Sequence, residues 1–150
     1  MQAIAATLDK IINEYRAALN TIPLKDFNFK PAPEKWSKKE IIGHIIDSAQ
    51  NNLRRFIVAQ YEETPLVVYN QDKWVVASNY QQWDADELIS LWFLQNNQIV
   101  YILNNMSAGM SQRKCQTQSL HTIEWLAGDY IKHLLHHLHV VLNLEPVAYP

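Results

Sequence analysis

The chain has 150 residues, and its 13 Lys and Arg against 15 Asp and Glu leave a formal net charge of −2 at pH 7. That length predicts a single domain over residues 1–150, and 48% hydrophobic residues are enough for a buried core. The near-neutral charge argues against a protein that binds nucleic acid by neutralising phosphates. No apolar run approaches the length of a membrane span, and the N-terminus lacks the features of a signal peptide. We therefore expect a soluble, cytoplasmic protein with no membrane partner.

Four stretches carry apolar residues at helical spacing. This spacing predicts helices over residues 3–19, 37–61, 85–106 and 122–144. The second stretch opens with Ser37 as the N-cap and Glu40 three residues later, which together predict a capping box. Thr122 stands as the N-cap of the last stretch, and Pro65 and Pro146 limit the second and last helices.

The connections between these helices predict how the chain is routed. Residues 63–83 have no helical period and are too many for a tight turn, so we expect a crossover that joins parallel neighbouring helices. Residues 107–121 form a polar connector with no strand pattern, and we expect its Cys115 to be a surface thiol rather than a nucleophile. The predicted fold class is all-α: a four-helix bundle with a long crossover between the second and third helices.

Four of the six histidines lie within residues 133–139, on the last predicted helix. At about 100° per residue, His137 lies about 60° and His133 about 100° from the centre of the apolar face. His136 and His139 lie about 140° or more from that centre. The pair at positions i and i+4 can direct two ring nitrogens to one point, which is half of a metal site. The same spacing is also typical of a histidine-rich helix face with no ligand.

His44 lies on the second predicted helix, at the margin between its apolar and polar faces. If the two helices pack side by side, His44 meets His133 and His137, and three neutral imidazoles around a divalent ion leave positions for water or substrate. A histidine held at the core edge by a hydrogen bond is the commoner case, and geometry alone leaves both interpretations open. Three other kinds of site are excluded by their missing motifs. The chain has no Glu-x-x-His for a carboxylate di-iron site, no His-Glu-x-x-His for a zincin protease and no Gly-x-Ser-x-Gly for a serine nucleophile elbow.

Two segments resemble the signatures of the DinB-like superfamily of bacterial four-helix bundles. The first is Trp36-Ser37, an acid that opens the helix, and then His44-x-x-Asp47. The second is His133-x-x-His136-His137 on a late helix. The order of the segments and the long connector between them also fit, so the likeness covers essentially the whole chain.

The resemblance implies a divalent metal ion, nickel or zinc, held by His44, His133 and His137 with waters completing the shell. It also implies the crossover between the second and third helices, and a homodimer. Many relatives carry Gln where this chain has Val140, so no polar contact is expected from this position.

Neighbouring polar residues are candidates for supporting roles. Asp47 either reaches the rim of the site or is an exposed acid. Asp129, one turn before His133, either accepts the second ring N–H of that histidine or is a plain surface carboxylate. Gln95 and Asn96 interrupt the apolar stripe of the third helix, where they line a pocket or face a partner.

The leading hypothesis is a metal-dependent enzyme that acts on a small molecule, as a hydrolase or a transferase of a low-molecular-weight thiol. A bound divalent ion lowers the pKa of water or of a thiol and creates a nucleophile near neutral pH. The thiol follows from the resemblance, because characterised relatives include such transferases. Two other classes stay open: a non-catalytic, stress-associated bundle that binds metal or a small ligand and dimerises, and a carrier that uses the Trp- and Tyr-rich connector.

Overall fold

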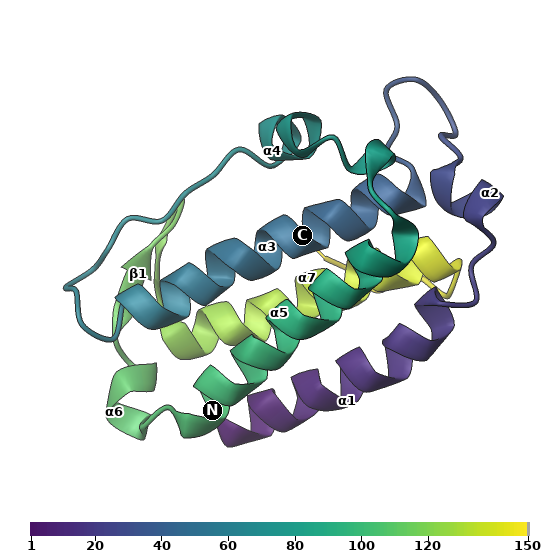
Figure 1. Cartoon of the computed structure of the whole chain (residues 1–150). Coiled ribbons are helices and arrows are strands. Elements are labelled where there is room, and N and C mark those ends of the chain that lie inside the picture. Colours follow the sequence, from purple (N-terminus) through teal and green to yellow (C-terminus); the bar gives the residue numbers. More distant parts are fainter. Residues whose placement is uncertain (150) are drawn as a thin grey trace.

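The computed structural model describes residues 1–149, and four long helices make up most of the chain (Figure 1). They are α1 (Gln2–Leu19), α3 (Lys38–Val58), α5 (Ala85–Asn105) and α7 (Ile123–Leu142). Each helix lies within its predicted stretch or extends it by a single residue, so the all-α prediction is confirmed. Within residues 1–149, none of the helices is long and apolar enough to cross a membrane.

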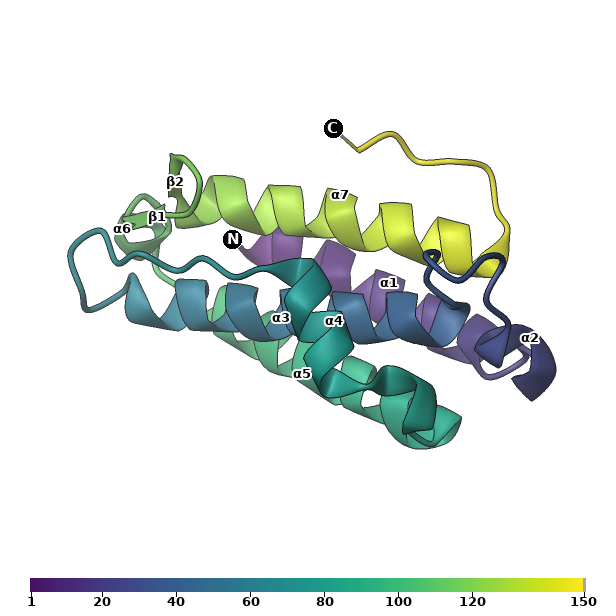
Figure 2. The same ribbon diagram turned by 90° about the horizontal axis from the view of Figure 1, so that it is seen from above.

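The four helices form a bundle with an uncommon chain path. α1 packs against α5 and α7, and α3 packs against the same two helices. α3 and α5 run in one direction, whereas α1 and α7 run in the opposite direction (Figures 1 and 2). Because α3 and α5 are parallel neighbours, the chain must travel back along the bundle between them. The predicted crossover between the second and third long helices is therefore confirmed.

Local signals and one distant contact set the ends of α3. Ser37 accepts a hydrogen bond from the backbone N–H of Glu40, whose carboxylate accepts one from the N–H of Ser37, so the predicted capping box forms. The helix ends a few residues earlier than predicted. There the guanidinium of Arg113 donates to the carbonyls of Ala59 and Glu62 at 2.6 and 2.8 Å. These carbonyls beyond the helix end are satisfied by a distant segment, which periodicity could not indicate.

The connections contain short elements that periodicity did not reveal. They are α2 (Leu24–Asn28), α4 (Gln71–Ser78), the 3-10 helix η1 (Tyr80–Gln82), α6 (Ala108–Ser111), β1 (Lys114–Gln116) and β2 (Leu120–Thr122). The prediction that residues 107–121 contain no strand is wrong, since β1 and β2 pair in antiparallel fashion. Strands this short are below the length at which a period of two residues stands out.

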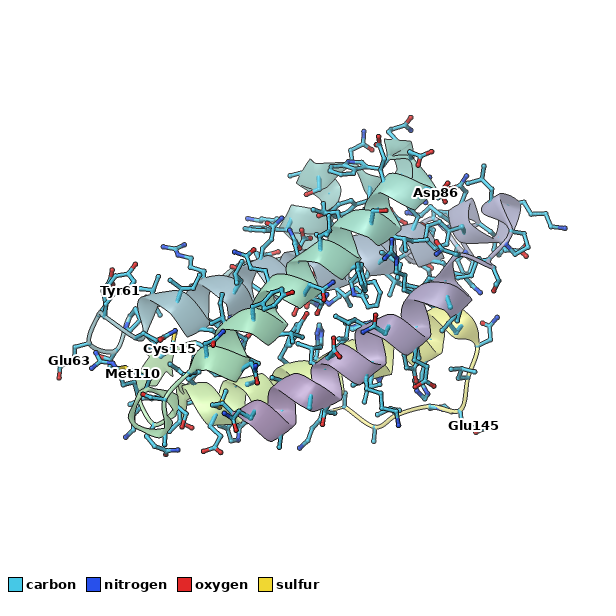
Figure 3. All side chains as sticks on the ribbon, turned by 60° about the horizontal axis from the view of Figure 1, so that its bottom comes forward. Tyr61, Glu63, Asp86, Met110, Cys115 and Glu145 are labelled. Carbon is cyan, nitrogen blue, oxygen red and sulfur yellow. The ribbon has the colours of Figure 1, made fainter. Side chains whose placement is uncertain are left out.

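The β1–β2 hairpin anchors the start of the crossover. Gln116 donates its N–H to the Pro65 carbonyl and accepts from the N–H of Val67, both at 2.9 Å. Cys115 is buried, its thiol donates to the Pro65 carbonyl at 3.2 Å, and burial raises its pKa. The expectation of a surface thiol is therefore wrong. Cys115 lies at the opposite end of the bundle from Glu145 (Figure 3).

The far end of the crossover is fastened at Gly43 of α3. A Cβ at this position would lie 2.1 Å from the ring of Tyr80, so the absence of a side chain lets the ring pack against the helix. Tyr80 is 4% exposed, and its hydroxyl donates to the carboxylate of Asp47 on the same helix. Between the two anchors, α4 packs against α3 (Figure 2).

We expect Gly43→Ala to destabilise the fold by about 1–3 kcal/mol, because the added methyl group overpacks against Tyr80. Gly128→Ala is the matched control: this glycine also lies inside a long helix, and nothing lies within 4 Å of its Cβ position. Alanine at position 128 should stabilise the fold by about 0.5–1 kcal/mol. Urea unfolding followed by circular dichroism measures both changes. An unchanged unfolding free energy for Gly43→Ala would contradict the close packing of Tyr80.

Candidate metal centre

Three histidines from two helices converge between α3 and α7. His44 lies on α3, and His133 and His137 lie one turn apart on α7. One ring nitrogen of each lies within 4.8 Å of a ring nitrogen of the other two. The Nε2 atoms of His44 and His133 are 3.1 Å apart. The structure therefore brings together the three histidines that the sequence singled out, and we call them the histidine cluster.

Helix packing explains how His44 reaches the cluster. α3 and α7 are neighbours that run in opposite directions, so the first half of α3 lies beside the second half of α7 (Figure 1). His44 is 1% exposed, which places it inside the bundle rather than at the margin of the apolar face. The ring of Trp36, just before the N-cap, packs against His44 with ring centroids 5.1 Å apart. This tryptophan shields the histidine from solvent.

A hydrogen bond to Ser48 orients the ring of His133. The Oγ of Ser48 lies 3.3 Å from His133 Nδ1. Asn52 donates to the same Oγ at 3.4 Å and to the Ser48 carbonyl at 2.9 Å. When Nδ1–H donates to the serine oxygen, the lone pair of the ring lies on Nε2, which faces His44. Such a bond on the second ring nitrogen is typical of histidines that bind metals.

Of the two roles that the sequence left open for Asp129, contact with the second ring nitrogen of His133 is not observed. Its carboxylate accepts a hydrogen bond from the hydroxyl of Tyr149 at 3.0 Å, and the Tyr149 ring packs against His133 with centroids 5.1 Å apart. The chain after α7 folds back along this helix (Figure 2). There the carbonyl of Val147 lies 2.7 Å from Nδ1 of His136. His136 therefore binds the returning backbone and is not part of the histidine cluster.

Asp47 is neither exposed nor part of the histidine cluster. It is 1% exposed, its Oδ1 accepts from the Tyr80 hydroxyl, and its Oδ2 has no hydrogen-bond partner among residues 1–149. Burial raises the pKa of this carboxyl to about 6, while the bond from Tyr80 acts in the opposite direction. Its contacts show a role in holding the crossover against α3.

Asn96 is a structural residue rather than part of a pocket. It is fully buried, accepts from the Tyr130 hydroxyl at 2.5 Å and donates to the Trp92 carbonyl at 2.8 Å. The bond to Tyr130 joins α5 to α7 through the core. Neither Asn96 nor Gln95 belongs to the histidine cluster.

Burial keeps the three imidazoles neutral at physiological pH. Burial first, and the neighbouring imidazoles second, together lower the pKa of His44, His133 and His137 from 6.5 to about 3. A neutral imidazole carries the lone pair that a metal ion needs. No proton therefore has to be displaced from these rings at pH 7.

The donor atoms of the cluster fit a divalent transition-metal ion. Imidazole nitrogen suits zinc, nickel, copper and iron. Two nitrogens bound to one ion at about 2.1 Å, with an angle of about 90–109° between them, lie about 3.0–3.4 Å apart. The His44 and His133 Nε2 atoms, 3.1 Å apart, match this separation. A set of three protein ligands also leaves room for water or a substrate.

An apolar cavity of about 850 Å³ opens beside His137. Its apolar walls include Phe29, Trp36, Val76 and Val140. Val140 thus contributes an apolar surface to this cavity. This cavity is large enough for a small molecule to reach the histidine cluster.

Sequence reasoning missed Ser48 and Tyr149. Ser48 stands four residues after His44, on the same face of α3, so its place beside the site could have been inferred from helix geometry. Tyr149 had no such signal, because it reaches His133 only through the reversal of the chain after α7. That reversal begins at Asn143, whose φ of 54° is left-handed and ends the helix.

Comparisons with known proteins place this geometry in a family. The family model described as the DinB superfamily matches residues 7–141. The chain belongs to the DinB superfamily. A relative from Halalkalibacterium halodurans, named "Putative metal-dependent hydrolase", is 31% identical over 108 residues. The match covers 69% of this chain and 61% of that protein, so this DinB-superfamily chain spans less than two thirds of its relative's length.

Solved structures with the same DinB fold include YfiT from Bacillus subtilis, described as "a probable metal-dependent hydrolase with an unusual four-helix bundle topology". The TM-score is 0.85 at 18% identity, covering 94% of this chain and 83% of YfiT. A mutant of the mycothiol-dependent maleylpyruvate isomerase matches with a TM-score of 0.77 at 16% identity, over 97% of this chain and 62% of the isomerase. At these identities the likeness shows the fold alone.

We expect acid to destabilise the metal-free DinB fold. Unfolded histidines take up protons near pH 6.5, but the three in the cluster do so only near pH 3, so protons favour the unfolded chain between these values. Asp47 has a raised pKa, so its protonation below about pH 6 favours the folded chain. This single carboxyl opposes the three histidines and offsets only part of their effect. The free energy of unfolding in urea and a chelator should therefore fall as the pH drops from about 7 to about 5.

A His133→Gln variant is the control for this pH dependence. It removes one of the three titrating groups, so its unfolding free energy should fall less steeply with acid than that of the wild type. A wild-type free energy that stays level over this range, or equal slopes for both proteins, would contradict burial of neutral imidazoles.

Proposed function

We propose that this DinB-superfamily protein is a metal-dependent enzyme acting on a small molecule, as a hydrolase or as a transferase of a low-molecular-weight thiol. The observation that carries the proposal is the convergence of the buried His44 with the partly buried His133 and His137 in a groove between α3 and α7. These three would hold a divalent ion, for which we expect nickel or zinc. Structural zinc sites usually close with four protein ligands, whereas three leave a position for chemistry.

The chain's own residues prepare the groove for such an ion. When bound, the ion would lower the pKa of water or of a thiol and so supply a nucleophile near neutral pH. Burial holds the imidazoles neutral, and Ser48 holds the His133 ring in place. Trp36 packs against His44 and Tyr149 against His133, so aromatic rings border the histidine cluster on two sides.

The relatives support the same class of chemistry. The name of the Halalkalibacterium relative and the description of YfiT both refer to a metal-dependent hydrolase, and the isomerase with this fold is named as mycothiol-dependent. The cavity of about 850 Å³ beside His137 has the size of a small-molecule pocket. Together they favour a small substrate that is brought to the histidine cluster.

Metal binding tests the first step of this proposal. Protein produced without an affinity tag should bind about one equivalent of Ni²⁺ or Zn²⁺, and loss of one ligand in His137→Ala should weaken binding about tenfold or more. His136→Ala is the matched control, because this neighbour on α7 binds the Val147 carbonyl instead. Competition with a chromophoric chelator measures the affinity of all three proteins. Equal affinities for the wild type and His137→Ala would remove the proposal.

The same samples distinguish the non-catalytic alternative. An ion that serves only structure contributes directly to folding and has no coordination position that exchanges water. Strong destabilisation by chelator, together with the absence of exchangeable water on the bound metal, would therefore favour a structural bundle over an enzyme.

We also propose that the protein is a homodimer. Leu94 and Tyr101 on α5 are 64% and 70% exposed and lie two turns apart on one helix face, which a second copy would cover. Sedimentation velocity at micromolar concentration should give about twice the chain mass of 17.5 kDa. Tyr101→Glu should shift the protein toward the monomer. A monomeric wild type would refute the dimer.

A further inference from the structure

The residues that follow α7 return along this helix to the histidine cluster (Figure 2). The segment begins at Asn143, whose left-handed backbone ends the helix, and the structure describes it as far as Tyr149. There the Tyr149 ring lies against His133, with ring centroids 5.1 Å apart. We call residues 143–149 the strap, because they connect the end of α7 to the surface of the cluster.

The base of the strap is fastened to two long helices through His139. The Nε2 of this histidine lies 2.7 Å from the Tyr15 hydroxyl on α1, and its Nδ1 lies 2.7 Å from the Glu145 carbonyl. A neutral ring satisfies both bonds when it accepts at Nε2 and donates from Nδ1. The N–H of Leu144 also donates to the His139 carbonyl at 2.9 Å. His139 lies outside the cluster, and its contacts show a role in anchoring the strap.

The tip of the strap rests on two side-chain hydrogen bonds. One joins the Val147 carbonyl to Nδ1 of His136 at 2.7 Å, and the other joins the Tyr149 hydroxyl to the Asp129 carboxylate at 3.0 Å. Within residues 1–149, residues 145–149 form no backbone–backbone hydrogen bond, and no residue of the strap is fully buried. A segment with so few buried contacts opens at a low free-energy cost. The tip can therefore leave α7 while the base stays in place.

The other neighbours of the cluster are fixed by the core. His44 is buried inside α3, and Trp36 directly precedes the capping box of that helix. The crossover is fastened by Val67 and Tyr80, which are 2% and 4% exposed. Moving any of these groups would disturb a long helix or a buried side chain. The tip of the strap is thus the neighbour of the cluster that moves at the lowest cost.

Movement of the tip would extend a cavity toward the cluster. A cavity of about 710 Å³ lies beside α3 and α7, and its walls include Arg55, Asp129 and Tyr149. Tyr149 also packs against His133, so its ring borders both the cavity and the cluster. When the tip leaves α7, this ring leaves His133 and the cavity gains access to that imidazole.

We propose that the strap is a gate: its tip opens to let an ion or a small molecule reach the histidine cluster, and it closes with the Tyr149–Asp129 bond as its latch. This inference rests on the proposed function, in which a species enters and leaves the cluster. The Tyr149 hydroxyl binds Asp129, and the strap adds no ligand to the cluster. An ion therefore has the same affinity with the strap open or closed, so the gate changes both rates by one factor and leaves their ratio unchanged.

The rate of metal release tests the gate. Tyr149→Phe keeps the ring against His133 and removes the bond to Asp129. This variant should release Zn²⁺ to excess EDTA about fivefold faster than the wild type, with a dissociation constant that stays within about twofold. His136→Ala, which frees the Val147 carbonyl, should give the same two results. A chromophoric zinc indicator measures both the release and the equilibrium.

Tyr61→Phe is the matched control. It removes the same hydroxyl group from a tyrosine that is 68% exposed and lies outside the strap and the cluster. We expect this variant to release Zn²⁺ at the wild-type rate and to bind it with the wild-type affinity.

A second measurement uses metal-free protein. Diethyl pyrocarbonate acylates neutral imidazoles, and mass spectrometry of peptides measures the rate at each histidine. Tyr149→Phe should raise the rate at His133 about fivefold, because the reagent reaches this ring when the tip is open. His121 on β2 is the internal reference, and its rate should be equal in the variant and the wild type.

Equal release rates for Tyr149→Phe and Tyr61→Phe would overturn the inference, as would an unchanged rate of acylation at His133. Faster release with an equal loss of affinity would also overturn it, because Tyr149 would then stabilise the bound ion and not gate it. A wild type that binds no zinc would refute the metal proposal alone. The acylation of His133 would then decide the gate by itself.

Discussion

The packing of α3 against α7 is the interaction on which the site depends. Both helices are amphipathic, and their apolar faces close the core of the bundle. Because the helices are antiparallel, His44 near the start of α3 meets His133 and His137 near the end of α7. A change of one helical turn in their relative position would move His44 by about 5.4 Å, beyond the reach of an ion shared with the other two. The core thus sets the geometry of the histidine cluster.

The crossover gives the groove its walls. It is held at one end by the hairpin, through Pro65 and Val67, and at the other end by Tyr80 packed onto Gly43. These anchors let α4 lie against α3, where Asp72 borders the apolar cavity. A tight turn between antiparallel helices would leave this side of the bundle bare. The crossover between parallel helices therefore supplies one wall of the groove.

The groove contains polar groups that the fold alone would not favour. The Nδ1 of His44 and the Oδ2 of Asp47 are buried without hydrogen-bond partners among residues 1–149. Burying such groups costs stability, and apolar residues would pack the same space more favourably. Perturbed titratable groups of this kind gather at functional sites. Their position in and beside the histidine cluster agrees with a groove shaped for chemistry at some expense of stability.

By themselves, the residues determined the long helices, their caps, the need for a crossover and the pairing of His133 with His137. Each of these follows from local rules: helical period, capping chemistry, the length of a connection and the spacing of one turn. The tertiary structure decided that Ser48 rather than Asp129 orients His133, that Cys115 is buried, and that Tyr149 returns to the cluster. These contacts join segments far apart in the chain, and their partners depend on the register of α3 against α7 and on chain reversals at loops. Both are set by packing of the whole core, which no local pattern records.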